Sequence, residues 1–226
     1  MTLNPPHRKS VRHFNVLGHA HLLTFSCYRR LPLLTNDVWR ALLSDRINWA
    51  AERHRFGLIA FVYMPEHLHL LVHSQVEECT VQRILYSIKK PFADKIKQLL
   101  TESNSPLLSR LTVQERPGKI VFRFWQEGPG HDRNLLTVEN CIKAAEYIHN
   151  NPVRRRLCRS PNEWKWSSWK FYHQAPVLCA HLATPHQRLS TMIKFFLAFT
   201  RAANNRCPCH TNACHCHPPA ARATQM

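Results

Sequence analysis

The chain has 226 residues, which is enough for one globular domain with an additional arm or tail. Hydrophobic residues make up 44% of it and only five residues are glycine, which argues against a wholly disordered or fibrous chain. Lysine and arginine outnumber aspartate and glutamate by 31 to 14, so the formal net charge is +17 and a nucleic acid is the expected partner. No run of 18 apolar residues occurs, so we expect no membrane span.

The cysteines and the N-terminus indicate a reducing compartment. The basic N-terminal residues lack the apolar stretch of a secretory signal. Nine cysteines, an odd number, without such a signal fit reduced thiols, and the expected location is the cytoplasm. Five of these cysteines are scattered singly and are expected to be small buried side chains.

The first half of the chain predicts strands on either side of a helix. In chain order, the elements are one or two strands at 15–28, a helix at 38–54, and strands at 57–63 and 67–73. Pro65 and Glu66 form a tight turn between the last two strands, which should therefore pair antiparallel.

The second half predicts two further helices. In chain order, the elements are a helix at 78–100, a loop at 101–118, a strand at 119–126, a helix at 137–151 and a short helix at 191–201. Pro91 should kink or split the first of these helices, and Pro152 should end the second. This order of elements predicts an α+β fold.

Two histidines on the strand at 67–73 form a candidate metal site. Alternate residues of a strand share one face, so His67 and His69 point the same way, about 7 Å apart along the strand. Two imidazoles so placed can bind one divalent ion and leave positions open for a third ligand and substrate. The alternative is a chance pair, because the chain has 16 histidines.

The helix at 137–151 provides a candidate nucleophile. Tyr147 and Asn151 are four residues apart and share one helix face, with Lys143 one turn earlier. A tyrosine hydroxyl attacks a phosphodiester when a metal ion or cation stabilises the developing charge. Lys143 is the candidate cation and Asn151 a candidate metal ligand, whereas the alternative is a buried tyrosine that only packs its ring.

Four stretches resemble the REP-associated tyrosine transposases. In chain order they are YMPEHLHLLVH (63–73), RFWQEGPGHDRNL (123–135), EYIHNNPVRRRL (146–157) and SPNEWKWSSWKFY (160–172). These transposases belong to the HUH single-strand nucleases, which are named for two histidines that flank a hydrophobic residue. The resemblance runs from about Val11 to Tyr172.

The resemblance implies a fold, a reaction and a set of site residues. The fold is a central antiparallel sheet flanked by helices, of the ferredoxin-like HUH type. The reaction is cleavage and rejoining of single-stranded DNA next to a hairpin, through a 5′-phosphotyrosine link and with a divalent metal ion, Mg²⁺ or Mn²⁺. Tyr147 is the implied nucleophile, and His67, His69 and Asn151 are the implied metal ligands. His131 stands where several relatives have tyrosine, and it is not expected to be catalytic if Tyr147 is.

Basic and aromatic residues around this helix are candidates for DNA contacts. The basic ones flank the helix or lie on it: Lys119, Arg123, Arg133, Lys143, Arg154, Arg155 and Arg156. A merely solvated basic face is the alternative, but the large net charge favours DNA contact. Trp164, Trp166 and Trp169 either stack on bases or pack in the core.

We therefore expect four regions. They are a flexible basic arm at 1–12, an HUH transposase domain at 13–175, a helical extension at 176–200 and a disordered tail at 201–226. The tail is rich in cysteine and histidine, but its spacing fits no standard zinc pattern. Two alternatives to a transposase remain, namely a DNA-binding protein that no longer cuts and a metal-binding protein centred on the tail. Whether the chain is a monomer or a homodimer is left open.

Overall fold

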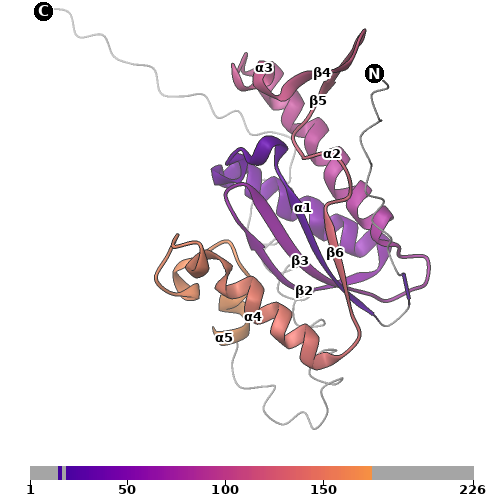
Figure 1. Ribbon diagram of the computed structural model, residues 1–226, viewed down its shortest axis with the longest axis vertical. Coiled ribbons are helices and arrows are strands. Elements are labelled where there is room, and N and C mark those ends of the chain that lie inside the picture. Colours follow the sequence, from indigo (N-terminus) through magenta and orange to yellow (C-terminus); the bar gives the residue numbers. More distant parts are fainter. Residues whose placement is uncertain (1–14, 17–18, 175–226) are drawn as a thin grey trace, which may run out of the picture.

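A four-stranded antiparallel sheet lies at the centre of the computed structural model, which describes residues 15–16 and 19–174 (Figure 1). Its strands are β1 (Ala20–Ser26), β2 (Phe56–Tyr63), β3 (His67–Ser74) and β6 (His131–Leu135). They lie in the order β2-β3-β1-β6, and every neighbouring pair is antiparallel. The α+β prediction is therefore confirmed, including the antiparallel pairing of the two closely spaced strands.

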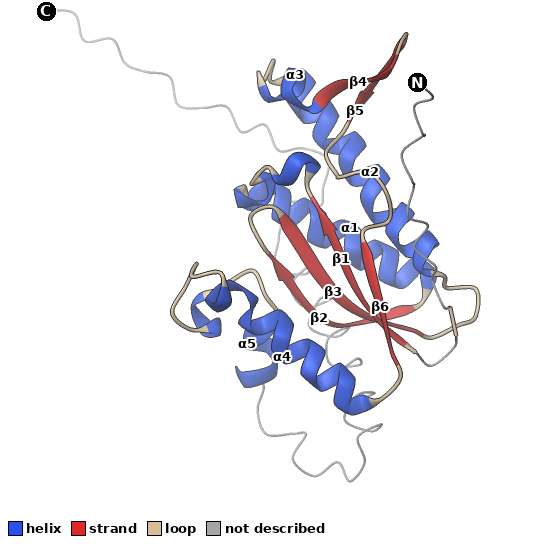
Figure 2. Ribbon diagram, viewed as in Figure 1, coloured by secondary structure: helices blue, strands red, loops and turns tan. Residues whose placement is uncertain are grey.

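Helices cover both faces of this sheet (Figure 2). The helices on one face are α1 (Asp37–His54) and α2 (Val81–Glu102), and the other face carries α4 (Val138–Arg154) with α5 (Trp169–Gln174). Short helical turns complete the described part, at Tyr28–Arg30, Leu33–Thr35 and Pro161–Glu163. With α1 between β1 and β2, and α2 between β3 and β6, the sheet has ferredoxin-like topology.

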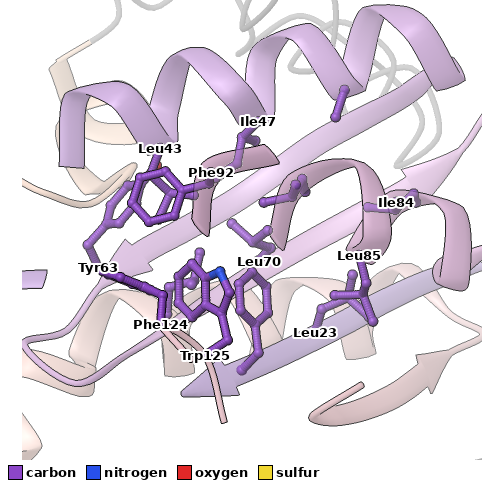
Figure 3. Close-up of a cluster of buried hydrophobic side chains, with 14 of the residues drawn as sticks. Leu23, Leu43, Ile47, Tyr63, Leu70, Ile84, Leu85, Phe92, Phe124 and Trp125 are labelled. Atoms are coloured by element: carbon purple, nitrogen blue, oxygen red, sulfur yellow. The ribbon is translucent and has the colours of Figure 1, made fainter. Parts of the chain in front are cut away.

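The alternation of side chains in β3 separates the core from the candidate site. Leu68 and Leu70 face α1 and α2 and belong to the larger hydrophobic core, which Figure 3 shows. Leu71, on the opposite face, belongs to the smaller core beneath α4. His67 and His69 share the face of Leu71, because strand residues alternate. Burial of the leucines thus fixes the histidines on the α4 side.

Two helices run through prolines that were expected to interrupt them. Pro91 was expected to kink or split its helix, and the split does not occur, because α2 is one helix of 22 residues. The prediction that Pro152 ends its helix is wrong, since α4 continues to Arg154. A proline removes one backbone donor, and burial of apolar residues such as Ile88 and Phe92 on both sides of Pro91 offsets that loss.

The segment between α2 and β6 contains structure that the sequence did not indicate. The expected loop at 101–118 instead contains α3 (Leu107–Leu111) and β4 (Thr112–Arg116). β4 pairs with β5 (Lys119–Phe122) in a separate two-stranded sheet. β6 was also not predicted, because its sequence HDRNL is polar and it occupies the edge of the sheet.

The segment after α4 covers the other edge of the sheet. The Ser168 backbone N–H donates to the Phe61 carbonyl (3.0 Å), and the Tyr63 N–H donates to the Trp166 carbonyl (2.9 Å). The Trp164 indole donates to the Tyr63 carbonyl (2.9 Å), and the Trp166 indole donates to an Asp37 carboxylate oxygen (2.7 Å). These bonds favour packing over base stacking for both tryptophans.

Several expectations lie outside the described residues. They are the arm at 1–12, the helix at 191–201 and the regions at 176–200 and 201–226, so the proposed four-region division is not tested. Within the described part, no helix is both long enough and apolar enough to cross a membrane.

Candidate active site

The four residues expected to perform the reaction line one pocket. Tyr147, His67, His69 and Asn151 surround a cavity of about 340 Å³. The two histidines lie at the start of β3, and the tyrosine and the asparagine lie in the C-terminal half of α4. The structure thus brings the histidines of β3 and the tyrosine of α4 together in one pocket.

The two imidazole rings face each other. His67 Nε2 and His69 Nε2 are 3.1 Å apart, and the rings meet edge to face with centroids 4.8 Å apart. His67 Nδ1–H donates to the Glu66 carboxylate (3.1 Å), so its Nε2 carries a lone pair. His69 Nδ1 is hydrogen-bonded to the Thr24 hydroxyl (2.7 Å). The two Nε2 atoms therefore face one common point, which is suited to a shared proton or a metal ion.

A divalent ion fits this arrangement. Two nitrogens that each lie about 2.1 Å from one ion at a right angle are about 3 Å apart, close to the separation of the two histidines. The Asn151 side-chain amide lies 3.0 Å from His69 Nε2, and rotation of the amide presents its oxygen to the same point. Among the described residues, no group of three or more histidine, cysteine, aspartate or glutamate side chains forms a metal site, so the set here is two imidazoles and an amide.

The surroundings keep both imidazoles neutral, as metal ligation requires. Burial, together with the charges of His67 and His131, lowers the pKa of His69 to about 3. Burial also lowers the pKa of His67, although the neighbouring Glu66 carboxylate acts in the opposite direction. At neutral pH, both rings therefore retain a lone pair for an electrophile.

Tyr147 is accessible to a substrate. Its side chain is 40% exposed, and its ring lies edge to face with His69, with centroids 5.6 Å apart. The Arg154 guanidinium lies over the tyrosine ring, 5.1 Å from its centroid. The alternative of a buried tyrosine that only packs is thus not what the structure contains, and the phenol shares its pocket with a cation.

The predicted DNA-contacting residues separate into two groups. Arg154 and Arg155 line the pocket, and Arg155 also pairs with Glu66 (2.9 Å). The others do not line it: Arg133, Lys143 and Arg156 are exposed, while Lys119 and Arg123 pair with Glu115 on the β4–β5 hairpin. Lys143, the expected cation beside the nucleophile, therefore lies outside the pocket, and Arg154 is beside the tyrosine instead.

Four residues of the site were not identified from the sequence. Thr24, Ser26 and Arg30 line the cavity, and Arg30 has a left-handed backbone (φ 53°). Thr24 also orients His69, and Glu66 orients His67. Thr24 lies directly opposite His69 in the β1–β3 register, which no local pattern reveals. Glu66 directly precedes His67, so an acidic residue next to the histidine pair is the sequence feature that could have indicated its role.

Part of the chain matches a known protein family. Residues 15–110 match the family described as "Transposase IS200 like". This region includes both histidines, whereas Tyr147 and α4 lie beyond it. A search of curated proteins finds no match.

Two solved structures are similar to the chain. The first is a REP-associated tyrosine transposase bound to a REP hairpin, with 18% sequence identity, a TM-score of 0.58, and coverage of 78% of this chain and 92% of that one. The second is a transposase from Deinococcus radiodurans R1, with 17% identity, a TM-score of 0.38, and coverage of 65% and 97%. Residues 15–110 are therefore similar to the IS200-like transposases, and the fold of the chain is similar to that of a REP-associated tyrosine transposase, as the sequence resemblance implied.

Proposed function

We propose that the chain is a DNA strand transferase that nicks and rejoins single-stranded DNA beside a hairpin, with Tyr147 as its nucleophile. The observation that carries this proposal is the shared pocket of Tyr147, His67 and His69. A relative with this fold was solved with a hairpin bound, which supports the same class of partner here. The net charge of +17 is also suited to a polyanion.

The residues of the pocket divide the reaction among them. Arg154 and Arg155 bind the oxygens of the scissile phosphate and hold it beside the phenol. The Tyr147 oxygen forms a bond to phosphorus while the bond to the DNA 3′-oxygen breaks, so the phenol loses a proton and the 3′-hydroxyl gains one. The 5′-phosphotyrosine link conserves the phosphodiester, and attack by a 3′-hydroxyl rejoins the strand without a nucleotide cofactor.

His67, His69 and Asn151 are the proposed holders of a divalent ion, Mg²⁺ or Mn²⁺. Such an ion, when bound, polarises the scissile phosphate and stabilises charge that develops on it. Glu66 and Thr24 hold the two imidazoles in the orientation that this binding needs.

A covalent adduct tests this function. A hairpin oligonucleotide labelled at its 3′ end is incubated with the protein and Mg²⁺ or Mn²⁺, and the products are separated under denaturing conditions. We expect the wild type and Tyr86→Phe to retain the label on the protein, because the Tyr86 hydroxyl lies outside the active-site pocket and phenylalanine keeps the ring. Tyr147→Phe should retain none.

If the wild type forms no adduct with either ion but still binds the hairpin, the chain is instead a DNA-binding protein that no longer cuts. The third possibility, a metal-binding protein centred on the tail, concerns residues outside the described part.

A further inference from the structure

A groove runs along α2, on the face of the sheet opposite the candidate active site. One cavity of about 470 Å³ lies between α2 and the segment at 122–129. A second cavity of about 650 Å³ lies between the start of α2 and the end of α1. Tyr86 lines both cavities and is 67% exposed. We call the two cavities with this tyrosine the α2 groove.

The first cavity is suited to a planar aromatic ring. Phe122, Phe124 and Trp125 contribute apolar rings to its wall. Lys89 also lines it, and Lys89 Nζ donates to the Gly128 carbonyl (2.6 Å), which fixes this ammonium beside the aromatic wall. Lys90 lines it too, but it pairs with Asp94 of the same cavity (2.7 Å). An apolar wall with one cation beside it matches a nucleobase that carries a phosphate.

The second cavity is suited to phosphates. Arg53, Arg55 and Arg83 line it, with Glu78 as the acidic residue among them. His54 lines it as well, and its pKa is lowered first by burial and then by the charges of the surrounding arginines. Three arginines against one glutamate leave a net charge of +2 within one cavity, where it attracts an anion.

We propose that the α2 groove binds unpaired nucleotides of single-stranded DNA, with a base stacked on Tyr86 and neighbouring phosphates bound by Arg53, Arg55 and Arg83. An exposed phenol ring between an apolar cavity and a basic cavity offers both interactions that a flexible single strand makes with proteins. Bases in a duplex are already stacked and paired, so a duplex would leave Tyr86 without a partner. This inference extends the proposed function, because it presupposes a DNA substrate.

The loop at 128–130 links the groove to the candidate active site. Gly128 lines the groove. Gly130, two residues later, packs so closely on β1 that a Cβ there would lie 2.2 Å from the Thr24 carbonyl oxygen, and its φ is +87°. Thr24 in turn lines the active-site pocket. A single DNA strand that follows this loop around the β6 edge of the sheet can therefore contact both the α2 groove and the active-site pocket.

Binding of a fluorescent single-stranded oligonucleotide, measured by anisotropy with the full chain in EDTA, tests the groove. All variants carry Tyr147→Phe, so that neither cleavage nor the nucleophile contributes. We expect Tyr86→Ala to weaken binding by about five-fold or more, because stacking on one aromatic ring contributes at least this factor. Tyr86→Phe should bind like the parent, since it keeps the ring. Binding by Tyr86→Ala that equals the parent's would overturn the proposal.

Charge reversal separates the groove from the general basicity of the chain. Arg83→Glu and Lys97→Glu change the net charge equally, and both residues are exposed on α2, but only Arg83 lines the groove. We expect Arg83→Glu to weaken binding several-fold more than Lys97→Glu. Equal losses would show a diffuse electrostatic effect and contradict a defined groove.

Photo-crosslinking locates the bound base. An oligonucleotide that contains 5-iododeoxyuridine should crosslink to the peptide that contains Tyr86. Crosslinks that map only to other peptides would refute the stacking contact. Because these assays need no cleavage, the groove can be established even if no covalent adduct forms at Tyr147, and the adduct can form even if the groove does not bind.

Discussion

At the scale of single residues, the histidine pair depends on what holds the far side of each ring. His67 and His69 direct their Nε2 atoms at each other only because Glu66 and Thr24 bind the two Nδ1 atoms. Thr24 reaches across from the neighbouring strand, whereas Glu66 belongs to the turn before β3. Partners of this kind affect metal affinity although they do not touch the metal.

Thr24→Val tests the role of the hydroxyl. Valine keeps the shape of threonine but cannot bond His69 Nδ1, so the ring loses its fixed orientation. We expect about a 10- to 100-fold loss of Mn²⁺ affinity, measured by calorimetry, with folding unaffected. Thr24→Ser retains the hydroxyl and should bind within a few-fold of the wild type. A Thr24→Val variant with unchanged affinity would show that the hydroxyl does not orient the ligand.

The burial of Lys89 predicts that the stability of the folded protein depends on pH. Burial lowers the pKa of this lysine from its ordinary 10.5 to about 8. Between about pH 8 and 10.5 the unfolded chain therefore holds more protons than the folded one, so this residue makes the free energy of unfolding rise with pH in that window. Below pH 8 both states are protonated, and the full cost of burying the charge remains.

Lys89→Met removes that cost. We expect the variant to be more stable than the wild type at pH 7 by about 1–2 kcal/mol, after the lost bond to Gly128 is allowed for, and the difference to shrink towards pH 10. Urea denaturation at both pH values measures it. A difference that grows with pH would contradict the assigned direction of the pKa.

At the scale of elements, the sheet edge at β2 is covered by the segment around Ser168. Its hydroxyl oxygen accepts from the Phe61 N–H (2.9 Å) and is hydrogen-bonded to His149 of α4 (2.8 Å). One buried side chain therefore connects β2 with α4, the helix that carries Tyr147. The sequence offered Trp164 and Trp166 as the prominent residues of this segment, and their indoles bond β2 and α1 instead of remaining free to stack on DNA.

Ser168→Ala should destabilise the protein by about 1–3 kcal/mol, because buried groups on β2 and α4 lose a partner. Equilibrium urea unfolding measures this change. Ser109→Ala provides the control: its hydroxyl is exposed and bonds only the Pro106 carbonyl (2.8 Å), so we expect a change within about 0.5 kcal/mol. Equal effects of the two substitutions would show that the Ser168 bonds do not couple the elements.

Elements with a strong periodic pattern were predictable, and those without one were not. The period of two in β3 placed His67 and His69 on one face, and the spacing of four in α4 placed Tyr147 beside Asn151. The strands β4 and β6 have no buried face that repeats, so the sequence shows no pattern for them, whereas β5 lies within the strand predicted at 119–126. Likewise, Thr24 joins the site through strand register, which only the folded sheet determines.

At the scale of the whole molecule, topology brings together residues that are 80 positions apart. β3 lies inside the sheet between β2 and β1, and α4 crosses its free face, so His67 and Tyr147 meet in one pocket. The basic side chains around this pocket differ in whether carboxylates already neutralise them. Arg154 lines the pocket, whereas Arg123 lies between the carboxylates of Glu115 (2.6 Å) and Glu127 (3.4 Å).

This unequal pairing predicts which arginines determine the salt dependence of DNA binding. For single strands, the logarithm of the binding constant falls with the logarithm of salt concentration by about 0.7 per phosphate neutralised. In a Tyr147→Phe background with EDTA, Arg154→Gln should reduce the magnitude of this slope by about 0.7, since it removes one phosphate contact. Arg123 lines the first cavity of the α2 groove, but Arg123→Gln should change the slope much less, because two carboxylates already neutralise that guanidinium. Anisotropy titrations at four salt concentrations measure both, and a slope that changes equally in the two variants would mean that the DNA responds to the overall charge and not to the pocket.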